Sequence, residues 1–189
     1  MKRPVVDVRE YDPSWVERFE GLRAEYAAAL HAAGVPHLAI EHVGSTAVPG
    51  LAAKPIVDCD IVVDAEHVAA ASDVLVSLGF EPRGELGIPL RWAYWEPDRL
   101  LGTNTYVVVA GSLALRNHLA VRDELLRNPE LRDEYGAVKM RLAATDVDIY
   151  EYGAGKNEIV QRILATAGLN EEERNSINAN QVPVTKRQR

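Results

Sequence analysis

Two aspartates in an apolar run are the residues of this chain with the clearest capacity for chemistry. Asp58 and Asp60 are spaced i and i+2 between Ile56 and Val63, and alternate side chains of a strand share one face of the sheet. Two neighbouring carboxylates repel each other unless a cation lies between them, and in proteins that cation is usually divalent. The pair therefore predicts a divalent metal site for phosphates, with Asp58 and Asp60 as its ligands and as the candidate catalytic residues.

A Gly-Ser turn precedes the acidic pair. Gly44 allows the backbone to approach a ligand closely, and the Ser45 hydroxyl with the following amides donates hydrogen bonds to phosphate oxygens. Lys54, between the turn and the acids, adds a positive charge. Taken alone, the turn is an ordinary bend and the acids are a solvated strand face; taken together, they favour a metal-assisted phosphate site.

The same stretch resembles a known family. The run from residue 42 to residue 58, HVGSTAVPGLAAKPIVD, resembles the signature of the GrpB (UPF0157-like) proteins, which are classed with the polymerase-beta type of nucleotidyltransferases. The resemblance extends over approximately residues 5–167. It implies a nucleotidyltransferase-like fold, a nucleoside triphosphate substrate with a bound Mg²⁺ or Mn²⁺ ion, and transfer of a nucleotidyl group to a small-molecule acceptor.

Further basic residues gain meaning from this resemblance. Arg91 follows a Gly-Ile-Pro turn as an arginine does in the family, which makes it a candidate phosphate-binding residue. Arg122, Lys139 and Lys156 stand at positions similar to those of basic residues in the helices of GrpB proteins. Each of them alone is better explained as a solvated charge, and only the resemblance makes them candidate nucleotide-binding residues.

Hydrophobic periodicity and turn residues predict the elements that position these groups. We expect strands over residues 38–43, 56–63, 80–85, 90–96 and 103–109, and helices over residues 13–30, 64–78 and 113–127, with two more beginning near residues 130 and 156. This order indicates an α/β (α+β) fold in which a mixed β-sheet is flanked by helices and the C-terminal half is helical. Residues 1–168 are expected to form one domain, and residues 169–189 a polar tail that is disordered or ordered only against a partner.

Composition restricts the class of protein. The chain has 189 residues, of which 47% are hydrophobic and 26% charged, and this is ordinary for a globular domain. No apolar run has the length of a membrane span and no signal peptide is evident, so we expect a cytoplasmic protein with no membrane partner. The formal net charge of −7 disfavours nucleic acid as a partner, because nonspecific binding to phosphate backbones requires a basic surface.

A third carboxylate is missing from the expected pattern. Nucleotidyltransferases usually carry it on a later strand, whereas residues 103–109 contain no acid and place Asn104 and Tyr106 there. Glu85, Glu96 and Asp98 are the remaining candidates for that role.

Two alternatives to a transferase therefore stay open. One is a nucleotide-binding or regulatory module that has lost its chemistry. The other is a phosphatase of the haloacid dehalogenase type, because residues 58–62, DCDIV, formally fit its aspartate motif.

Overall fold

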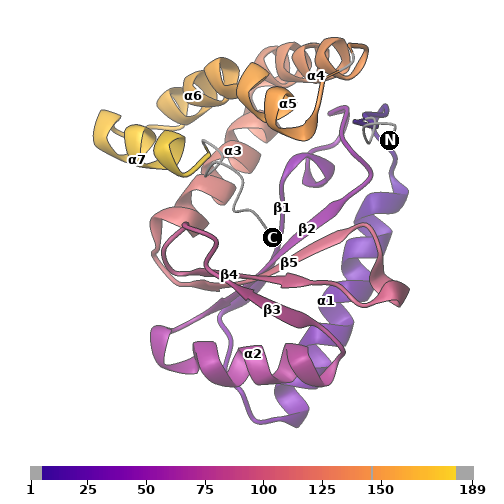
Figure 1. The fold of residues 1–189 in the computed structure, drawn as a ribbon, viewed down its shortest axis with the longest axis vertical. Helices are drawn as coiled ribbons and strands as arrows, with labels where there is room; N and C mark the ends of the chain where they lie inside the picture. The colour runs from indigo at the N-terminus through magenta and orange to yellow at the C-terminus, as the bar shows by residue number, and fades with distance from the viewer. Residues whose placement is uncertain (1–5, 146, 182–189) are drawn as a thin grey trace.

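A five-stranded mixed sheet forms the centre of the molecule. The computed structural model describes residues 6–145 and 147–181. The strands follow the order β1-β2-β5-β4-β3, and β2 is parallel to β5 while the other neighbouring pairs are antiparallel (Figure 1). Their bounds are β1 Ala39–Val43, β2 Val57–Val63, β3 Glu81–Gly84, β4 Arg91–Trp95 and β5 Thr103–Val109. The two parallel strands lie side by side in the middle, so β2 is paired on both edges.

One face of the sheet is covered by α1 (Ser14–Ala32) and α2 (Val68–Ser77) (Figure 1). The β2 side chains at Val57, Cys59 and Ile61 point to this side and are fully buried in the main hydrophobic cluster. Burial of aliphatic and aromatic side chains from both helices against this face is the principal driving force for folding of this half.

The other face of the sheet is only partly covered. The helix α3 (Leu113–Arg127) packs Ala114 and Leu115 against Val62 of β2 and Val108 of β5. The remaining helices extend from α3 and form the helical half of the molecule (Figure 1). They are α4 Pro129–Ala143, α5 Ile149–Gly155, α6 Asn157–Thr166 and α7 Glu171–Gln181. This face therefore leaves room for a site between the sheet and the helices.

The predicted fold class is confirmed: the structure is an α+β fold with a mixed sheet, flanking helices and a helical C-terminal half. Capping side chains explain several helix boundaries. The Asp12 carboxylate accepts a hydrogen bond from the Ser14 amide, and the Ser112 and Asn128 side chains accept from the first turns of α3 and α4. The helix expected from residue 64 begins instead at Val68, after a short 3-10 turn at Ala65–His67.

The segment after residue 168 differs from the expectation of a disordered tail. Residues 171–181 form α7, which packs against α3 and α6. Ile177 is buried in the same hydrophobic cluster as Ile163 and Leu164 of α6, and Arg116 of α3 forms an ion pair with Glu173. The segment is polar overall, so its single buried isoleucine was not recognised as an anchor. The folded part of the chain thus extends past residue 168, and residues 182–189 lie outside the described residues.

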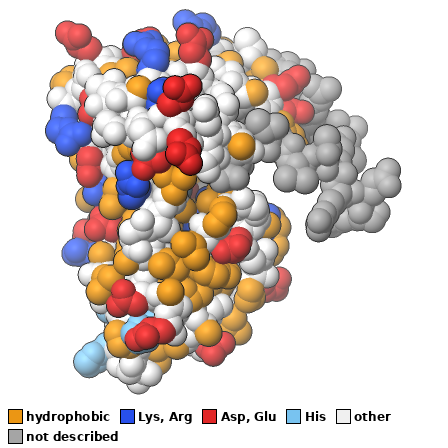
Figure 2. Space-filling view, turned by 90° about the vertical axis from the view of Figure 1, so that its left-hand side faces the viewer, with side chains coloured by type: hydrophobic (Ala, Val, Ile, Leu, Met, Phe, Trp, Pro, Cys, Tyr) orange, Lys and Arg blue, Asp and Glu red, His pale blue; other side chains and the backbone are white. Residues whose placement is uncertain are grey.

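Hydrophobic side chains are unevenly distributed over the surface that Figure 2 shows. Figure 2 shows hydrophobic side chains gathered in the lower half of that view, which corresponds to the sheet half of the molecule. Among the described residues, no helix has the length and apolar character needed to cross a lipid bilayer.

The anchoring of α7 generates a stability prediction. Ile177→Ala should lower the free energy of unfolding by about 2 kcal/mol, because a buried aliphatic side chain is removed. Urea denaturation followed by circular dichroism measures the change. The exposed neighbour Ser176 is the control, and Ser176→Ala should change stability by less than about 0.5 kcal/mol. Equal stability of both variants and the parent would show that α7 contributes nothing to the fold.

Candidate functional site

The two aspartates of β2 project from the sheet face that α1 and α2 do not cover. Asp58 accepts a hydrogen bond at Oδ1 from the Asn104 amide on β5, at 2.7 Å. Asp60 is fully buried and its Oδ2 lies 2.7 Å from Nδ1 of His118 on α3. Cys59 points to the opposite face and is buried there. The prediction that both acids share one face, with Cys59 on the other, is therefore confirmed by their contacts.

The Gly-Ser bend meets Asp58 directly. Gly44 has φ +72° and ψ −171°, a conformation that is essentially restricted to glycine. A Cβ built at this position would lie 2.3 Å from Asp58 Oδ2, which is inside any permissible contact distance. The carboxylate of Asp58 thus occupies the space that a side chain at residue 44 would need.

A cavity of about 240 Å³ opens beside this contact. Gly44, Ser45, Lys54, Asp58 and Lys156 all line it, so the structure brings together five of the predicted site residues. Its other walls come from Ile56, Asn104, Val121, Leu125 and Tyr135. The cavity combines one carboxylate, two ammonium groups and a small-residue bend, which is a suitable surface for a metal-chelated polyphosphate.

A third lysine, Lys139, contacts the Gly44–Ser45 bend. Lys139 of α4 is only 2% exposed, and its Nζ donates a hydrogen bond of 2.8 Å to Ser45 Oγ. Burial, followed by the positive charges of Lys156 and Lys54, lowers the pKa of Lys139 to about 6. Burial and the neighbouring Lys156 also lower the pKa of Lys54. In the described part of the chain none of these three lysines forms an ion pair, and their closeness indicates a place for a multiply charged anion.

Aromatic rings hold these lysines in position. Lys54 and Lys156 lie over the ring of Tyr152, at 5.8 and 5.2 Å from its centroid, and Lys139 lies 4.4 Å from that of Tyr135. Such cation–π contacts stabilise ammonium groups without cancelling their charge. Lys54 and Lys156, which line the cavity, therefore remain available to an anion that enters it, whereas the buried Lys139 contacts Ser45.

Burial also makes the charged form of the acidic groups less favourable. Burial raises the pKa of Asp58 above its ordinary value, against the opposing effect of the Asn104 hydrogen bond. Burial alone would lower the pKa of His118, but the carboxylate of Asp60 more than compensates, so the pKa of His118 is raised. Asp60 Oδ1 is buried and has no hydrogen-bond partner among the described residues. Such an unpaired oxygen is costly unless a cation or donor binds it.

The strand register explains why a third carboxylate is not available on β5. Asp58 lies opposite Asn104 and Asp60 opposite Tyr106. In the described part of the chain, Glu85, Glu96 and Asp98 do not line the cavity, and no group of three or more His, Cys, Asp or Glu side chains is placed to hold a metal. Any metal here has two carboxylate ligands at most, Asp58 and Asp60.

Two predicted arginines lie elsewhere. Arg122 donates hydrogen bonds to Glu41 Oε2 at 2.6 Å, to the His42 carbonyl at 3.0 Å and to Asp123 Oδ1 at 2.7 Å, so it ties α3 to β1 and does not line the cavity. Arg91 lies on β4 over the ring of Tyr106 and lines a different cavity, so it is also absent from the walls around Gly44.

His42, which could have contacted substrate, is structural. It stacks on Phe19 with 4.5 Å between ring centroids, and its Nε2 lies 3.0 Å from Thr46 Oγ1. Burial, helped by the nearby Arg122 guanidinium, lowers its pKa to about 4.

Several groups in the site were not predicted from the sequence. His118 and Tyr152 come from helices remote in sequence, and their meeting with Asp60 and the lysines depends on how α3 and α5 pack. One contact does follow a feature of the sequence. Residue 104, where a third carboxylate was sought, is an asparagine, and its side-chain amide donates a hydrogen bond to Asp58.

This chain is similar in sequence to proteins of a known family. The family model described as "GrpB protein" matches residues 5–166 of this chain. The chain belongs to the GrpB family. A UPF0157 protein of Deinococcus radiodurans is 37% identical over 163 residues, which cover 86% of this chain and 82% of that protein. The UPF0157 protein YqkA of Bacillus subtilis is 31% identical over 175 residues; these span 92% of this chain but only 50% of YqkA, so this chain covers about half of that relative.

Solved structures agree with this assignment. The crystal structure of the conserved protein GrpB from Enterococcus faecalis superposes with a TM-score of 0.72 at 32% identity, covering 85% of this chain and 98% of that one. The Cid1 poly(U) polymerase with Mg and 3'-dATP bound gives a TM-score of 0.54 at 14% identity, covering 80% of this chain and 49% of the polymerase. The second likeness shows that the GrpB chain has a nucleotidyltransferase-like fold.

The contact between Gly44 and Asp58 generates a second prediction. Gly44→Ala should lower the free energy of unfolding by roughly 2 to 4 kcal/mol, because the new methyl group adds a clash with Asp58 to the backbone strain. Gly34→Ala is the matched control: Gly34 also has a positive φ, of +67°, but its Cβ would meet nothing within 4 Å. That variant should lose only about 1 kcal/mol. Equal losses in denaturant titrations would rule out the proposed steric contact.

The buried lysine generates a third prediction, about pH. Because the pKa of Lys139 is about 6 in the folded chain and has an ordinary value of 10.5, the unfolded chain binds one more proton between these limits. The stability of the protein should therefore rise with pH across this interval. Lys139→Met should raise the free energy of unfolding at pH 7 by on the order of 1 kcal/mol and should flatten the rise.

Arg141→Met, on the exposed side of the same helix, is the control and should leave the pH dependence unchanged. Denaturant titrations from pH 6 to pH 9 provide the measurement. A parallel pH dependence in Lys139→Met and the parent would contradict the lowered pKa.

Proposed function

We propose that this GrpB chain binds a metal-chelated nucleoside triphosphate at the Gly44–Ser45 bend and transfers its nucleotidyl group to a small-molecule acceptor. The observation that carries the proposal is the cavity in which the bend, Lys54, Lys156 and Asp58 converge. The nucleotidyltransferase-like fold supports this reading, because polymerases with that fold bind nucleotides. The net charge of −7 favours a small acceptor over a nucleic acid.

The phosphate-binding role falls to groups that the chain itself supplies. Ser45 accepts the hydrogen bond from Lys139, which leaves the Ser45 hydroxyl proton free to point toward a phosphate oxygen. Lys54 and Lys156 neutralise the charge of the outer phosphates. Since negative charge accumulates on the departing pyrophosphate, fixed ammonium groups on that side stabilise the transition state more than the ground state.

The acidic residues suit a magnesium or manganese ion. Mg²⁺ is commonly bound through one or two carboxylates, with phosphate oxygens and water completing its shell. Asp58, which lines the cavity, would be one ligand. The unpaired Oδ1 of Asp60 would be the second, although Asp60 is fully buried and does not line the cavity. The side chains of Asn104 and His118 hold the other carboxylate oxygens in place. The ion would supply charge neutralisation at the phosphates.

The reaction itself requires alignment more than covalent participation by the protein. A nucleophilic atom of the acceptor forms a bond to the α-phosphorus while the bond to the pyrophosphate oxygen breaks. The protein holds the triphosphate at the bend, between the sheet and the helical half. These effects account for rate enhancement without a protein nucleophile.

One observation favours a second candidate function. Asn104 and Tyr106 occupy the β5 positions opposite the two acids, so the third carboxylate typical of active transferases is replaced. A catalytically degenerate module that binds nucleotides for regulation would retain the bend and the lysines but not the chemistry. Mg²⁺-dependent ATP binding with no pyrophosphate release, whatever the acceptor, would identify this alternative.

The phosphatase alternative loses its support. The haloacid dehalogenase type carries its aspartates at the end of a first apolar strand. Asp58 and Asp60 instead lie in the first half of the second strand of a mostly antiparallel sheet.

A fourth prediction tests the transferase directly. Asp58→Asn should reduce nucleotidyl transfer by about 10²- to 10³-fold, as expected when one electrostatic group of an active site is removed. Pyrophosphate release is the readout, with circular dichroism to confirm folding. Asp73→Asn on the exposed side of α2 is the charge-matched control and should retain full activity. Full turnover in Asp58→Asn would refute the assignment.

A further inference from the structure

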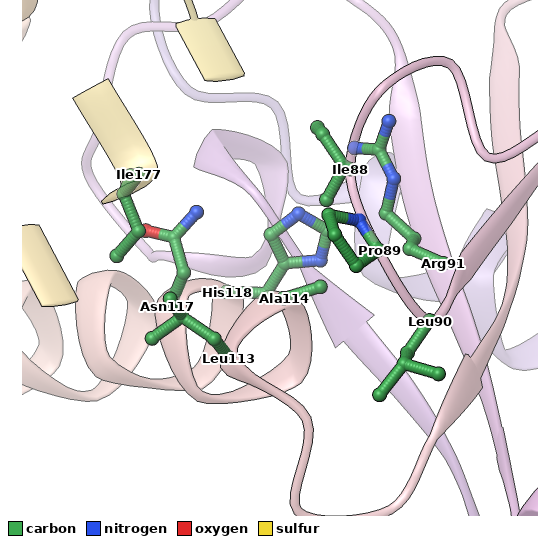
Figure 3. Close-up of a pocket in the computed structure, with 9 residues that line it drawn as sticks. All are labelled: Ile88, Pro89, Leu90, Arg91, Leu113, Ala114, Asn117, His118 and Ile177. Carbon is green, nitrogen blue, oxygen red and sulfur yellow. The ribbon is translucent and has the colours of Figure 1, made fainter. Parts of the chain in front are cut away.

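A second cavity, of about 250 Å³, lies on the same face of the sheet as the phosphate-binding cavity. One wall comes from the loop that enters β4, and the other from α3 and α7. Figure 3 shows Ile88, Pro89 and Arg91 on one side and Asn117 and Ile177 on the other, with His118 between them. The transferase mechanism described above gives this second cavity no role.

The two cavities are joined. A third cavity of about 400 Å³ shares Ile88, Asn117 and His118 with the second cavity, and Gly44 and Lys156 with the phosphate-binding cavity. His118 is also the residue that holds Asp60. A continuous groove therefore runs from Gly44 and Lys156, past His118, to the second cavity. A molecule in the second cavity lies at the end of this groove opposite the phosphates.

Arg91 is an uncompensated cation in this second cavity. Among the described residues it forms no ion pair, and its buried Nε has no hydrogen-bond partner. Its guanidinium lies 4.5 Å from the centroid of the Tyr106 ring, which holds it in place without neutralising it. A guanidinium prepared in this way matches a carboxylate or phosphate group, which accepts two parallel hydrogen bonds from it.

The rest of the lining selects the shape of the ligand. Ile88, Leu113, Ala114 and Ile177 provide aliphatic surface, and Asn117 adds an amide. Among the described residues that line this cavity there is no Phe, Tyr or Trp ring on which a nucleobase could stack, and the His118 imidazole is held by its contact with Asp60. The second cavity thus suits an aliphatic ligand better than the base of the nucleotide.

We propose that the second cavity binds the acceptor of the transfer reaction, and that this acceptor is a small amphipathic anion. Its carboxylate or phosphate group pairs with Arg91, and its aliphatic part packs against Ile88 and Ile177. The role of the bound molecule as acceptor rests on the proposed function, whereas the binding of an anion at Arg91 does not. In the transfer, a separate hydroxyl or amine of the acceptor bonds to the α-phosphorus, pyrophosphate leaves, and the proton passes to solvent.

The test uses 4-methylpentanoate as the anionic probe and 4-methylpentanamide as its neutral counterpart. Binding to the full chain is measured by isothermal titration calorimetry or NMR titration, without nucleotide. We expect the carboxylate to bind in the millimolar range and the amide to bind at least about tenfold more weakly, since only the carboxylate pairs with Arg91. Equal affinities, or no binding of the carboxylate, would overturn the proposal.

Variants locate the site. Arg91→Gln should weaken 4-methylpentanoate at least about tenfold, and Arg91→Lys should weaken it less because the charge is kept. Arg83→Gln is the matched control, because Arg83 also stacks on an aromatic ring, that of Trp95, but lies outside the second cavity. An unchanged affinity in Arg91→Gln, or an equal loss in Arg83→Gln, would contradict the site.

Competition with nucleotide separates this proposal from the transferase proposal. Saturating MgATP should leave the affinity for 4-methylpentanoate unchanged within about twofold, because the phosphates occupy the opposite end of the groove. Mutual displacement would assign the second cavity to the nucleotide and overturn the acceptor site. If Asp58→Asn abolishes ATP binding while 4-methylpentanoate still binds, the two sites are distinct, and failure of either proposal is recognised separately.

Discussion

The close approach of Gly44 to Asp58 is the constraint on which the site depends. A side chain at residue 44 would occupy the position of the Asp58 carboxylate. The bend can therefore approach β2 this closely only because residue 44 is a glycine. Because β2 is paired on both edges, Asp58 has little freedom to move away. Lys139 and Lys156 approach from the helical half and Lys54 from the loop before β2, so elements distant in sequence together create a charged cavity at this contact.

The site keeps several ionisable groups in an unfavourable state. Lys139 is buried among other cations, and one oxygen of Asp60 lacks a partner, although either defect would be removed by an apolar substitution. Stability alone does not explain such an arrangement. A ligand that carries negative charge at one end and a cation near the acids would relieve both defects at once.

Much of this architecture could be predicted from the sequence. Alternation in the run around Asp58 and Asp60 fixed their common face, and the pattern of glycine, proline and apolar residues located the strands and most helices. The polar composition of the segment from residue 171 did not predict the helix α7, because the buried side chain of Ile177 anchors it. The partners His118 and Tyr152, and the separate positions of Arg91 and Arg122, could not be predicted, because they depend on helix packing rather than on local pattern.

The helix α7 begins beyond the end of the region matched by the family model, which stops at residue 166. Through Ile177 it nevertheless forms one wall of the cavity that contains Arg91. Substrate preference and chemistry would then reside in separable stretches of polypeptide. If the second cavity holds the acceptor as proposed, replacement of α7 would change which compound fits while Gly44, Lys54 and Asp58 stay in place.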